Sequence, residues 1–155
     1  IFRTGGAMRH LAVDYSLNRL YADDMGTGLT YVMDMDTEQM KTLAPVDSHP
    51  NTIDLNPSGR FLYVSNRGAN NAKGYNIPGP EWGSVVVIDT KTGALVDAII
   101  GGNQTTGLDV SDDGRFVAFT DFLDNRLAVY EIPLPEVLEA GKGGLAPTRR
   151  RLIAK

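Results

Sequence analysis

The sequence lacks cysteine, has a single tryptophan and contains no long apolar run. The absence of cysteine excludes a disulfide scaffold, a thiolate metal site and a cysteine nucleophile. No apolar run approaches the roughly 20 residues that a helix needs to span a bilayer. Phosphate-binding loops, dinucleotide fingerprints and Gly-x-Ser-x-Gly nucleophile motifs are also missing. These absences exclude several enzyme classes and leave a protein whose fold is easier to infer than its activity.

An excess of positive charge is also absent, since 15 Lys and Arg stand against 19 Asp and Glu and the net charge is −4. This disfavours long-range attraction to nucleic acid. One basic cluster, Arg149 to Arg151 with Lys155, lies at the C-terminal end. Because no aromatic residues alternate with these side chains, as a nucleic-acid platform requires, we expect a solvated tail over residues 145–155.

The sequence is rich in turn-forming residues, with 17 glycines and eight prolines. It also contains one unit that occurs three times. NPSGRFLYVSN at 56–66 is repeated as SDDGRFVAFTD at 111–121 and, more loosely, as DYSLNRLYADD at 14–24. The second and third copies lie further apart than the first and second. Aligning Asp36 with Asp89 assigns the excess to an insertion after Asn66. Without the insertion both spacings fall within the roughly 40–45 residues that are typical of four-stranded propeller blades.

Short runs of Val, Ile, Phe and Tyr, bounded by Gly, Pro, Asn or Asp, predict the strands of each unit. In the turn Asn56-Pro57-Ser58-Gly59, Asn caps the turn, Pro presets φ and Gly accepts a positive φ. The following runs, FLYVS and FVAFT, are apolar at successive positions, so both faces of these strands should be buried. The sequence therefore predicts an all-β fold, a β-propeller of four-stranded antiparallel blades with about three blades in this chain.

The blade boundaries follow from the same register. Residues 1–6 align with 98–103, so the chain should begin inside an outer strand of a preceding blade. Three blades cannot close a ring. We therefore expect a C-terminal fragment of a larger propeller, or several copies that close a ring together. Pro135 and Gly141 favour a short helix between them over an outer strand at 136–142. The expected segments are 1–7, a blade at 8–48, a blade at 49–103 with an inserted loop at 67–83, a blade at 104–144 that is incomplete if the helix forms, and the tail.

The segments PSGRFLYVSNRG at 57–68 and SVVVIDTKTGALVDAIIGG at 84–102 resemble the YVTN-repeat family of β-propellers. The resemblance covers about residues 1–132 and weakens at 22–24, where Ala-Asp-Asp replaces Val-Ser-Asn. It implies a seven-bladed, surface-antigen-like propeller that is exported to the periplasm or cell surface and binds more often than it catalyses. Similar propellers include lactonases, haem d1 nitrite reductases and amine dehydrogenase heavy subunits, so the fold alone does not choose the function.

The insertion at 67–83 departs most from the repeat. It carries Tyr75 and the single Trp82 among several asparagines, a composition that suits protein or glycan binding. The alternative is that both rings fold back over the blade. Other polar residues at or after the second strands should share its face: Asn66, Arg67, Asp121 and Asn125.

Two histidines, His10 and His49, lie near corresponding ends of successive inner strands. A metal or haem site at the channel mouth would need further ligands, so hydrogen-bonded or exposed histidines are favoured. Calcium-like starts at Asp54 and Asp109 lack the acidic twelfth residue and are explained by turn chemistry.

We therefore expect no cofactor, no metal and no catalytic residues. The predicted function is a non-catalytic, exported propeller that binds a protein or glycan and associates with the rest of its ring. Two alternatives remain, a lactonase or lyase with its site at the channel mouth and a redox partner of haem or quinone.

Overall fold

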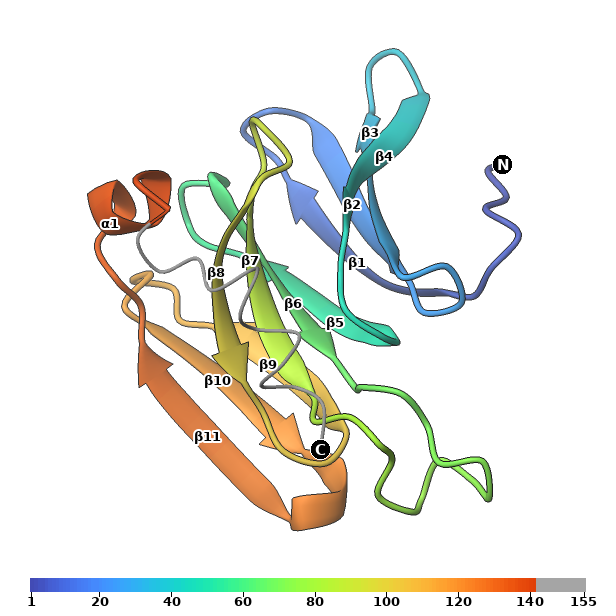
Figure 1. Ribbon diagram of the computed structural model, residues 1–155. Helices are drawn as coiled ribbons and strands as arrows, with labels where there is room; N and C mark the ends of the chain where they lie inside the picture. Colours follow the sequence, from blue (N-terminus) through green and yellow to red (C-terminus); the bar gives the residue numbers. More distant parts are fainter. Residues whose placement is uncertain (142–155) are drawn as a thin grey trace.

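A computed structural model of the chain describes residues 1–141 (Figure 1). Within this range the chain forms three antiparallel sheets, ordered β1-β2-β3-β4, β5-β6-β7-β8 and β11-β10-β9. The strands of the first sheet are β1 (Met8–Asp14), β2 (Arg19–Asp24), β3 (Leu29–Asp34) and β4 (Gln39–Pro45). Those of the second are β5 (Pro50–Leu55), β6 (Phe61–Asn66), β7 (Ser84–Asp89) and β8 (Leu95–Ile100). The third has β9 (Thr105–Val110), β10 (Phe116–Asp121) and β11 (Arg126–Glu131), followed by α1 (Pro135–Glu139).

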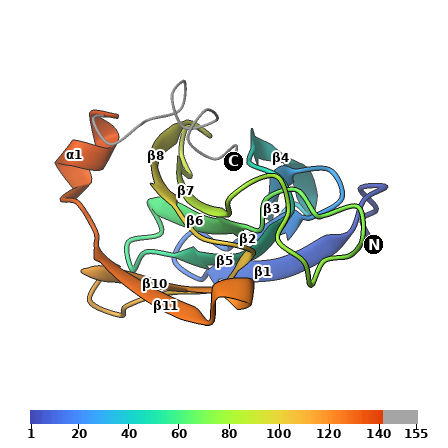
Figure 2. The same ribbon diagram turned by 60° about the horizontal axis from the view of Figure 1, so that its bottom comes forward.

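The three sheets stack face to face like the ribs of a fan (Figure 2). One buried apolar layer joins the first two sheets: Tyr21, Val32, Ala44, Ile53, Leu62, Val64, Val86 and Ile88. A second layer joins the second and third sheets: Phe61, Tyr63, Val85, Val87, Val96, Val110, Val117, Phe119 and Leu138. The all-β fold with about three propeller blades is therefore confirmed.

Strand β6 shows how the sequence encodes this stacking. Successive side chains of a strand point to opposite faces. Phe61 and Tyr63 belong to the layer with the third sheet, and Leu62 and Val64 to the layer with the first. All six residues of β6 are buried, as its continuous apolar run indicates.

The same prediction is wrong for β10. Val117 and Phe119 face the second sheet and are buried, whereas Phe116 and Thr120 are exposed. The reason is that no sheet among residues 1–141 packs on their side. The apolar pattern of β10 suits a strand with a sheet on both faces, and the described chain supplies only one.

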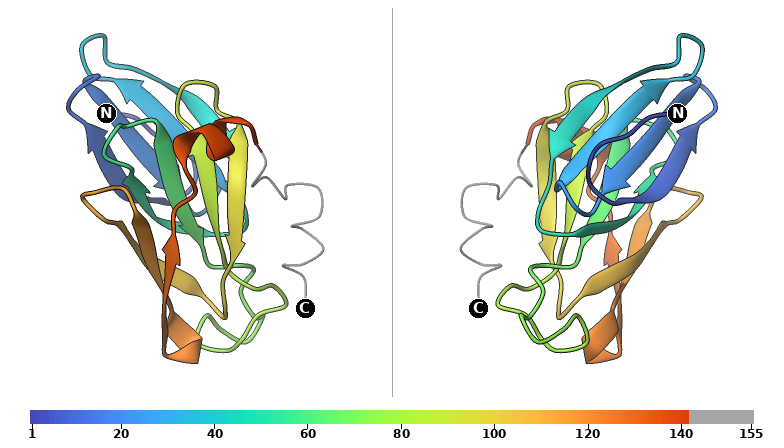
Figure 3. Two further views of the ribbon diagram at one scale, coloured as in Figure 1. Left: turned by 90° about the vertical axis from the view of Figure 1, so that its left-hand side faces the viewer. Right: turned by 90° about the vertical axis from the view of Figure 1, so that its right-hand side faces the viewer.

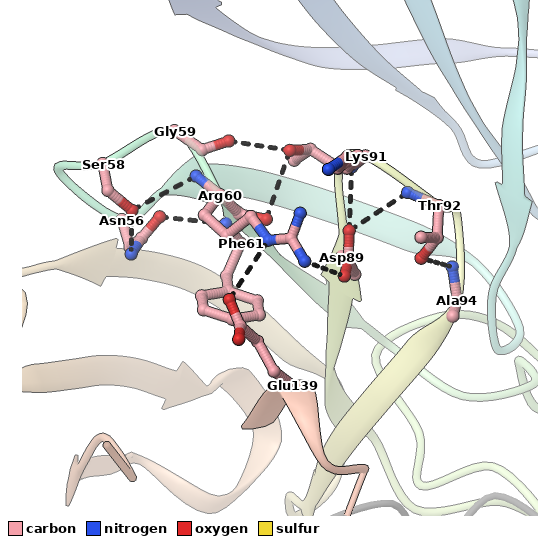
Figure 4. A network of polar contacts seen from close by, with 11 residues as sticks. Asn56, Ser58, Gly59, Arg60, Phe61, Asp89, Lys91, Thr92, Ala94 and Glu139 are labelled. Atoms are coloured by element: carbon pink, nitrogen blue, oxygen red, sulfur yellow. Dashed lines mark hydrogen bonds and ion pairs between the residues drawn. The ribbon is translucent and has the colours of Figure 1, made fainter. Parts of the chain in front are cut away.

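The repeated turns form as their residues dictate. Asn56 accepts a hydrogen bond from the Phe61 amide through its Oδ1 at 2.9 Å, and Gly59 has φ +68° (Figure 4). Ser111 plays the corresponding part for Phe116, at 3.0 Å. The side-chain oxygen therefore replaces a backbone partner and closes the hairpin where the apolar strand begins.

The turns after β3 and β7 correct the register used in the sequence alignment. They begin at Asp34 and Asp89, whose carboxylates accept backbone amides two and three residues on, and not at Asp36. The link between β6 and β7 runs over 67–83, whereas the corresponding links at 25–28 and 122–125 are short. The insertion is thus slightly longer than the alignment at Asp36 indicates, and the two repeat periods become equal.

The two ends of the described chain differ from a regular blade. Residues 1–7 form no strand and have no preceding sheet to pair with, so their place in an earlier blade stays a prediction. After β11 the chain turns into α1 instead of a fourth strand, as Pro135 indicates. Leu138 seals the second apolar layer, and Glu139 lies 3.7 Å from Arg60, which also pairs with Asp89 at 2.7 Å (Figure 4). The basic tail lies outside the described residues.

The helices within residues 1–141 include none that is long and apolar enough to cross a membrane.

Candidate functional site

The links before the inner strands (β1, β5 and β9) and after the second strands (β2, β6 and β10) lie at the same end of the stacked sheets (Figure 3). This end carries the long link 67–83, the link 101–104 before β9, and residues 122–125, which include the 3-10 helix η1 (Phe122–Asp124). We call this end the loop face. It holds seven of the eight residues singled out from the sequence, and His10 lies on β1 just below it.

The link 67–83 is folded by its own contacts. The Glu81 carboxylate accepts the Ala69 amide at 2.8 Å, and the Asn71 side chain donates to the Pro78 carbonyl at 3.0 Å. Gly79 passes so close to the Ala69 carbonyl that an added Cβ would collide with its oxygen. The link is therefore a compact structure with a defined surface, from which Tyr75 projects with 60% of its area exposed.

Arg67 begins this link and is held by side chains from elsewhere in the fold. Its Nε donates to Oε1 of Gln104 at 2.5 Å, and its guanidinium carbon lies 5.6 Å from the centre of the Tyr75 ring. Gln104 is only 2% exposed, and its own amide donates to Asn70 at 3.2 Å. Burial, with a smaller contribution from the nearby charge of Arg9, lowers the pKa of Arg67.

Gln104 was not among the residues singled out from the sequence. Its position directly before β9 is the only signal that could have found it, because residues before an inner strand lie on the loop face. Its backbone has φ +63°, and its side chain contacts Arg67 and Asn70 of the link 67–83, which no local sequence pattern indicates.

Asp121 and Asn66 lie on the loop face but are buried within it. Asp121 accepts hydrogen bonds from the Gly102 amide at 2.7 Å and the Thr105 hydroxyl at 2.5 Å, and pairs with Arg126 at 2.7 Å. Asn66 donates to Oγ of Ser84 at 3.3 Å, within its own sheet. Both side chains therefore hold the ends of strands together and present no open surface.

The two aromatic residues of the link behave differently. Trp82 is half-buried and lines a shallow hollow with Ile100, Gly101, Gly102, Asp124 and Arg126. Tyr75, by contrast, is 60% exposed, so the two rings do not share one environment. Asn125 is exposed in a left-handed conformation between η1 and β11.

The histidines have separate surroundings. Nδ1 of His10 lies 3.1 Å from the Ile53 carbonyl, which joins the inner strands of the first two sheets. His49 is half-buried in the link before β5, and its carbonyl accepts the Arg67 amide at 3.0 Å. Asp54, which begins one of the calcium-like segments, instead accepts the Val110 amide at 2.8 Å. Among residues 1–141, no group of three or more His, Asp or Glu side chains is arranged to hold a metal ion.

No family model matches the chain. The chain is 41% identical over 126 residues to Antigen Lp49 of Leptospira interrogans, across 81% of this chain and 28% of that protein. It is a homologue of Antigen Lp49. The chain thus spans less than a third of the length of this relative.

A solved structure shares the fold. Hydrazine synthase of Kuenenia stuttgartiensis superposes with a TM-score of 0.58 at 22% identity, over 79% of this chain and 36% of that one. At this identity the likeness supports the sheet architecture and carries no inference about activity.

Proposed function

We propose that this chain is part of an exported, non-catalytic β-propeller of the YVTN-repeat type, which binds a protein or glycan through its loop face. The repeat motifs in β6 and β7 and the homology to Antigen Lp49 support this assignment. Further blades would cover the exposed side of β10 and complete a seven-bladed ring. A place in the periplasm or on the cell surface is part of the same proposal.

The observation that carries the proposal is the folded link 67–83. Binding residues are commonly placed on loops that a rigid scaffold positions. Here the flanking strands keep full register, with Asn66 paired to Ser84 at the base of the link. The contacts within the link fix its shape, so that Tyr75 is exposed on a surface that is already ordered. Such pre-organisation reduces the entropy lost on binding.

The test is capture by the complete gene product with its link intact or shortened. In the shortened variant, residues 67–83 are replaced by Met25-Gly26-Thr27-Gly28, the short link between β2 and β3. Proteins and glycans of the extracellular fraction are captured on both forms and identified by mass spectrometry. A partner that binds the intact protein and is lost from the shortened one supports the proposal.

The control is Tyr15→Ala, which removes an exposed tyrosine (88% exposed) from the β1–β2 turn at the opposite end of the sheets. This variant should retain the partner. Equal capture by the intact and shortened forms would contradict the proposal, and so would a periplasmic or surface fraction that lacks the protein.

A further inference from the structure

Arg67 carries a charge that the described part of the chain does not neutralise. Between residues 1 and 141, Arg60 and Arg126 each lie 2.7 Å from a carboxylate, whereas Arg67 forms no ion pair. Its hydrogen-bond partner there is the neutral amide of Gln104. Apart from this amide and the Tyr75 ring, the described residues offer the guanidinium no partner, and its terminal nitrogens are not among the buried atoms that lack one, so they remain open to solvent or to a ligand.

The residues around Arg67 hold its guanidinium in this position. Gln104 is buried and bonded to Asn70, so it cannot move away from Nε. Tyr75 packs along the guanidinium, which limits the rotation of a long side chain. The charge of Arg9 adds to the positive potential at this point. An anion at this place would relieve both the loss of solvation and the repulsion between the arginines.

The geometry also indicates what kind of anion fits. With Nε directed at Gln104, the edge formed by the two terminal nitrogens has no hydrogen-bond partner among residues 1–141. Two parallel N–H groups match the two oxygens of a carboxylate, and this pairing is the strongest that arginine makes with a side chain. Arginine and tyrosine are also the residue types that dominate the binding energy of protein interfaces.

A protein partner suits this surface better than a sugar. A sugar ring stacks on an open face of an aromatic side chain, and the guanidinium of Arg67 occupies one of the two faces of Tyr75, whereas a carboxylate needs only the free edge of the guanidinium. We propose that Arg67, fixed by Gln104 and Tyr75, binds the carboxylate of an aspartate or glutamate side chain on a protein partner. This inference rests on the proposed function of the loop face and names the chemical group that it recognises.

The test uses random peptides displayed on phage, selected on the complete gene product, and then synthesised. Each selected peptide is measured by fluorescence anisotropy, both as such and with its acidic residues replaced by the corresponding amides. We expect the selected peptides to be acidic. Arg67→Gln should weaken their binding by about tenfold or more, and Arg67→Lys should restore it only in part, because lysine lacks the paired donors.

Two controls make the result specific. The amide form of each peptide should bind the intact protein and Arg67→Gln equally weakly, since the pair is already broken. Arg115→Gln should leave binding unchanged, because Arg115 also packs on an aromatic ring, at 5.1 Å from Phe116, but at the opposite end of the sheets.

The outcomes separate the two levels of the proposal. If shortening the link abolishes binding but Arg67→Gln does not, the loop face binds peptides and the carboxylate assignment is wrong. If no peptide is enriched, the carboxylate assignment fails, and the proposed function is then decided by the capture experiment alone. If shortening the link affects neither peptide binding nor capture, both proposals fail. Arg67-dependent binding of polygalacturonate in preference to every selected peptide would replace the protein partner with an acidic glycan.

Discussion

Phe61 and Phe116 provide a direct test of the stacked sheets, because they occupy the same place in two copies of the Gly-Arg-Phe motif. Each begins a second strand, and an arginine packs on each ring. They differ in what lies on the outer side of the strand. Phe61 is 1% exposed between two sheets, whereas Phe116 is 37% exposed on a side that no described sheet covers.

Replacement by alanine should therefore have different costs at the two positions. Phe61→Ala removes a ring from a closed layer and leaves a cavity, so the free energy of unfolding should fall by about 3–5 kcal/mol. Phe116→Ala removes a ring that is already partly in water, and solvent fills the space. Its cost should be about 1–2 kcal/mol, from the transfer contribution alone.

Urea denaturation of the purified chain, followed by circular dichroism, measures both values. Equal costs, or a cost below about 1 kcal/mol for Phe61→Ala, would refute the idea that β6 lies between two sheets. If the complete gene product has the proposed further blade against β10, Phe116 is covered there and the two costs become similar. The same pair of variants thus tests the larger ring.

Three further predictions concern single contacts. Asp121→Asn should lower the free energy of unfolding by about 2 kcal/mol, which is less than for a fully buried pair because Arg126 is half-exposed. Arg126→Gln should cost less, since Asp121 keeps its bonds to Gly102 and Thr105, and thermal unfolding of both variants measures the difference. Gly59→Ala should cost more than the about 1–2 kcal/mol of a left-handed alanine, because its Cβ would collide with Asp14 Oδ2. The Cβ of Gly114→Ala would come no closer than 3.2 Å to Pro57, so equal urea midpoints for the two variants would contradict this prediction. Burial raises the pKa of Asp97 above 3.8, so its contribution to stability is present at low pH and is lost as the pH rises through the raised pKa. Asp97→Asn should remove this fall in stability and be the more stable form at neutral pH, which urea titrations at several pH values measure.

Most of the fold could be predicted because the repeat unit carries its own turn and strand chemistry. Asn56 with Gly59, and Ser111 with Gly114, specify hairpins locally, and the continuous apolar run of β6 specifies a strand between two layers. The burial of β10 could not be predicted from its run, because that depends on whether another sheet is present. Similarly, the register error at Asp36 arose because Asp34 and Asp36 are both acidic and only the backbone shows which one starts the turn.

The candidate site was harder to predict from the sequence, because a polar residue at a strand end can either face solvent or hold the strand ends together. Asp121 and Asn66 look like surface residues but satisfy backbone and side-chain groups inside the loop face. Arg67 and Tyr75 are separated by several residues and meet only through the fold of the link. Gln104 lies in the link before β9, and no local pattern connects it to Arg67.

The long link follows the one second strand that ends in asparagine, Asn66, whereas the other two second strands end in aspartate, Asp24 and Asp121. Asp24 in the first sheet and Asp121 in the third accept backbone amides from the link before their own inner strand, at Ala7 and Gly102. In the second sheet Asn66 stands at this position and donates to Ser84, whose hydroxyl in turn donates to Asp47 at 2.6 Å.

The second sheet is therefore closed at this end by a chain of side chains that includes the first residue of β7. The six consecutive pairs between β6 and β7 keep these strands in register across the long link, and lengthening a loop costs little free energy. The backbone position of Arg67, the next residue after Asn66, is fixed by the same pairing, and its amide is held by the His49 carbonyl. The blade thus carries a long link while the backbone of the first residue of that link remains positioned.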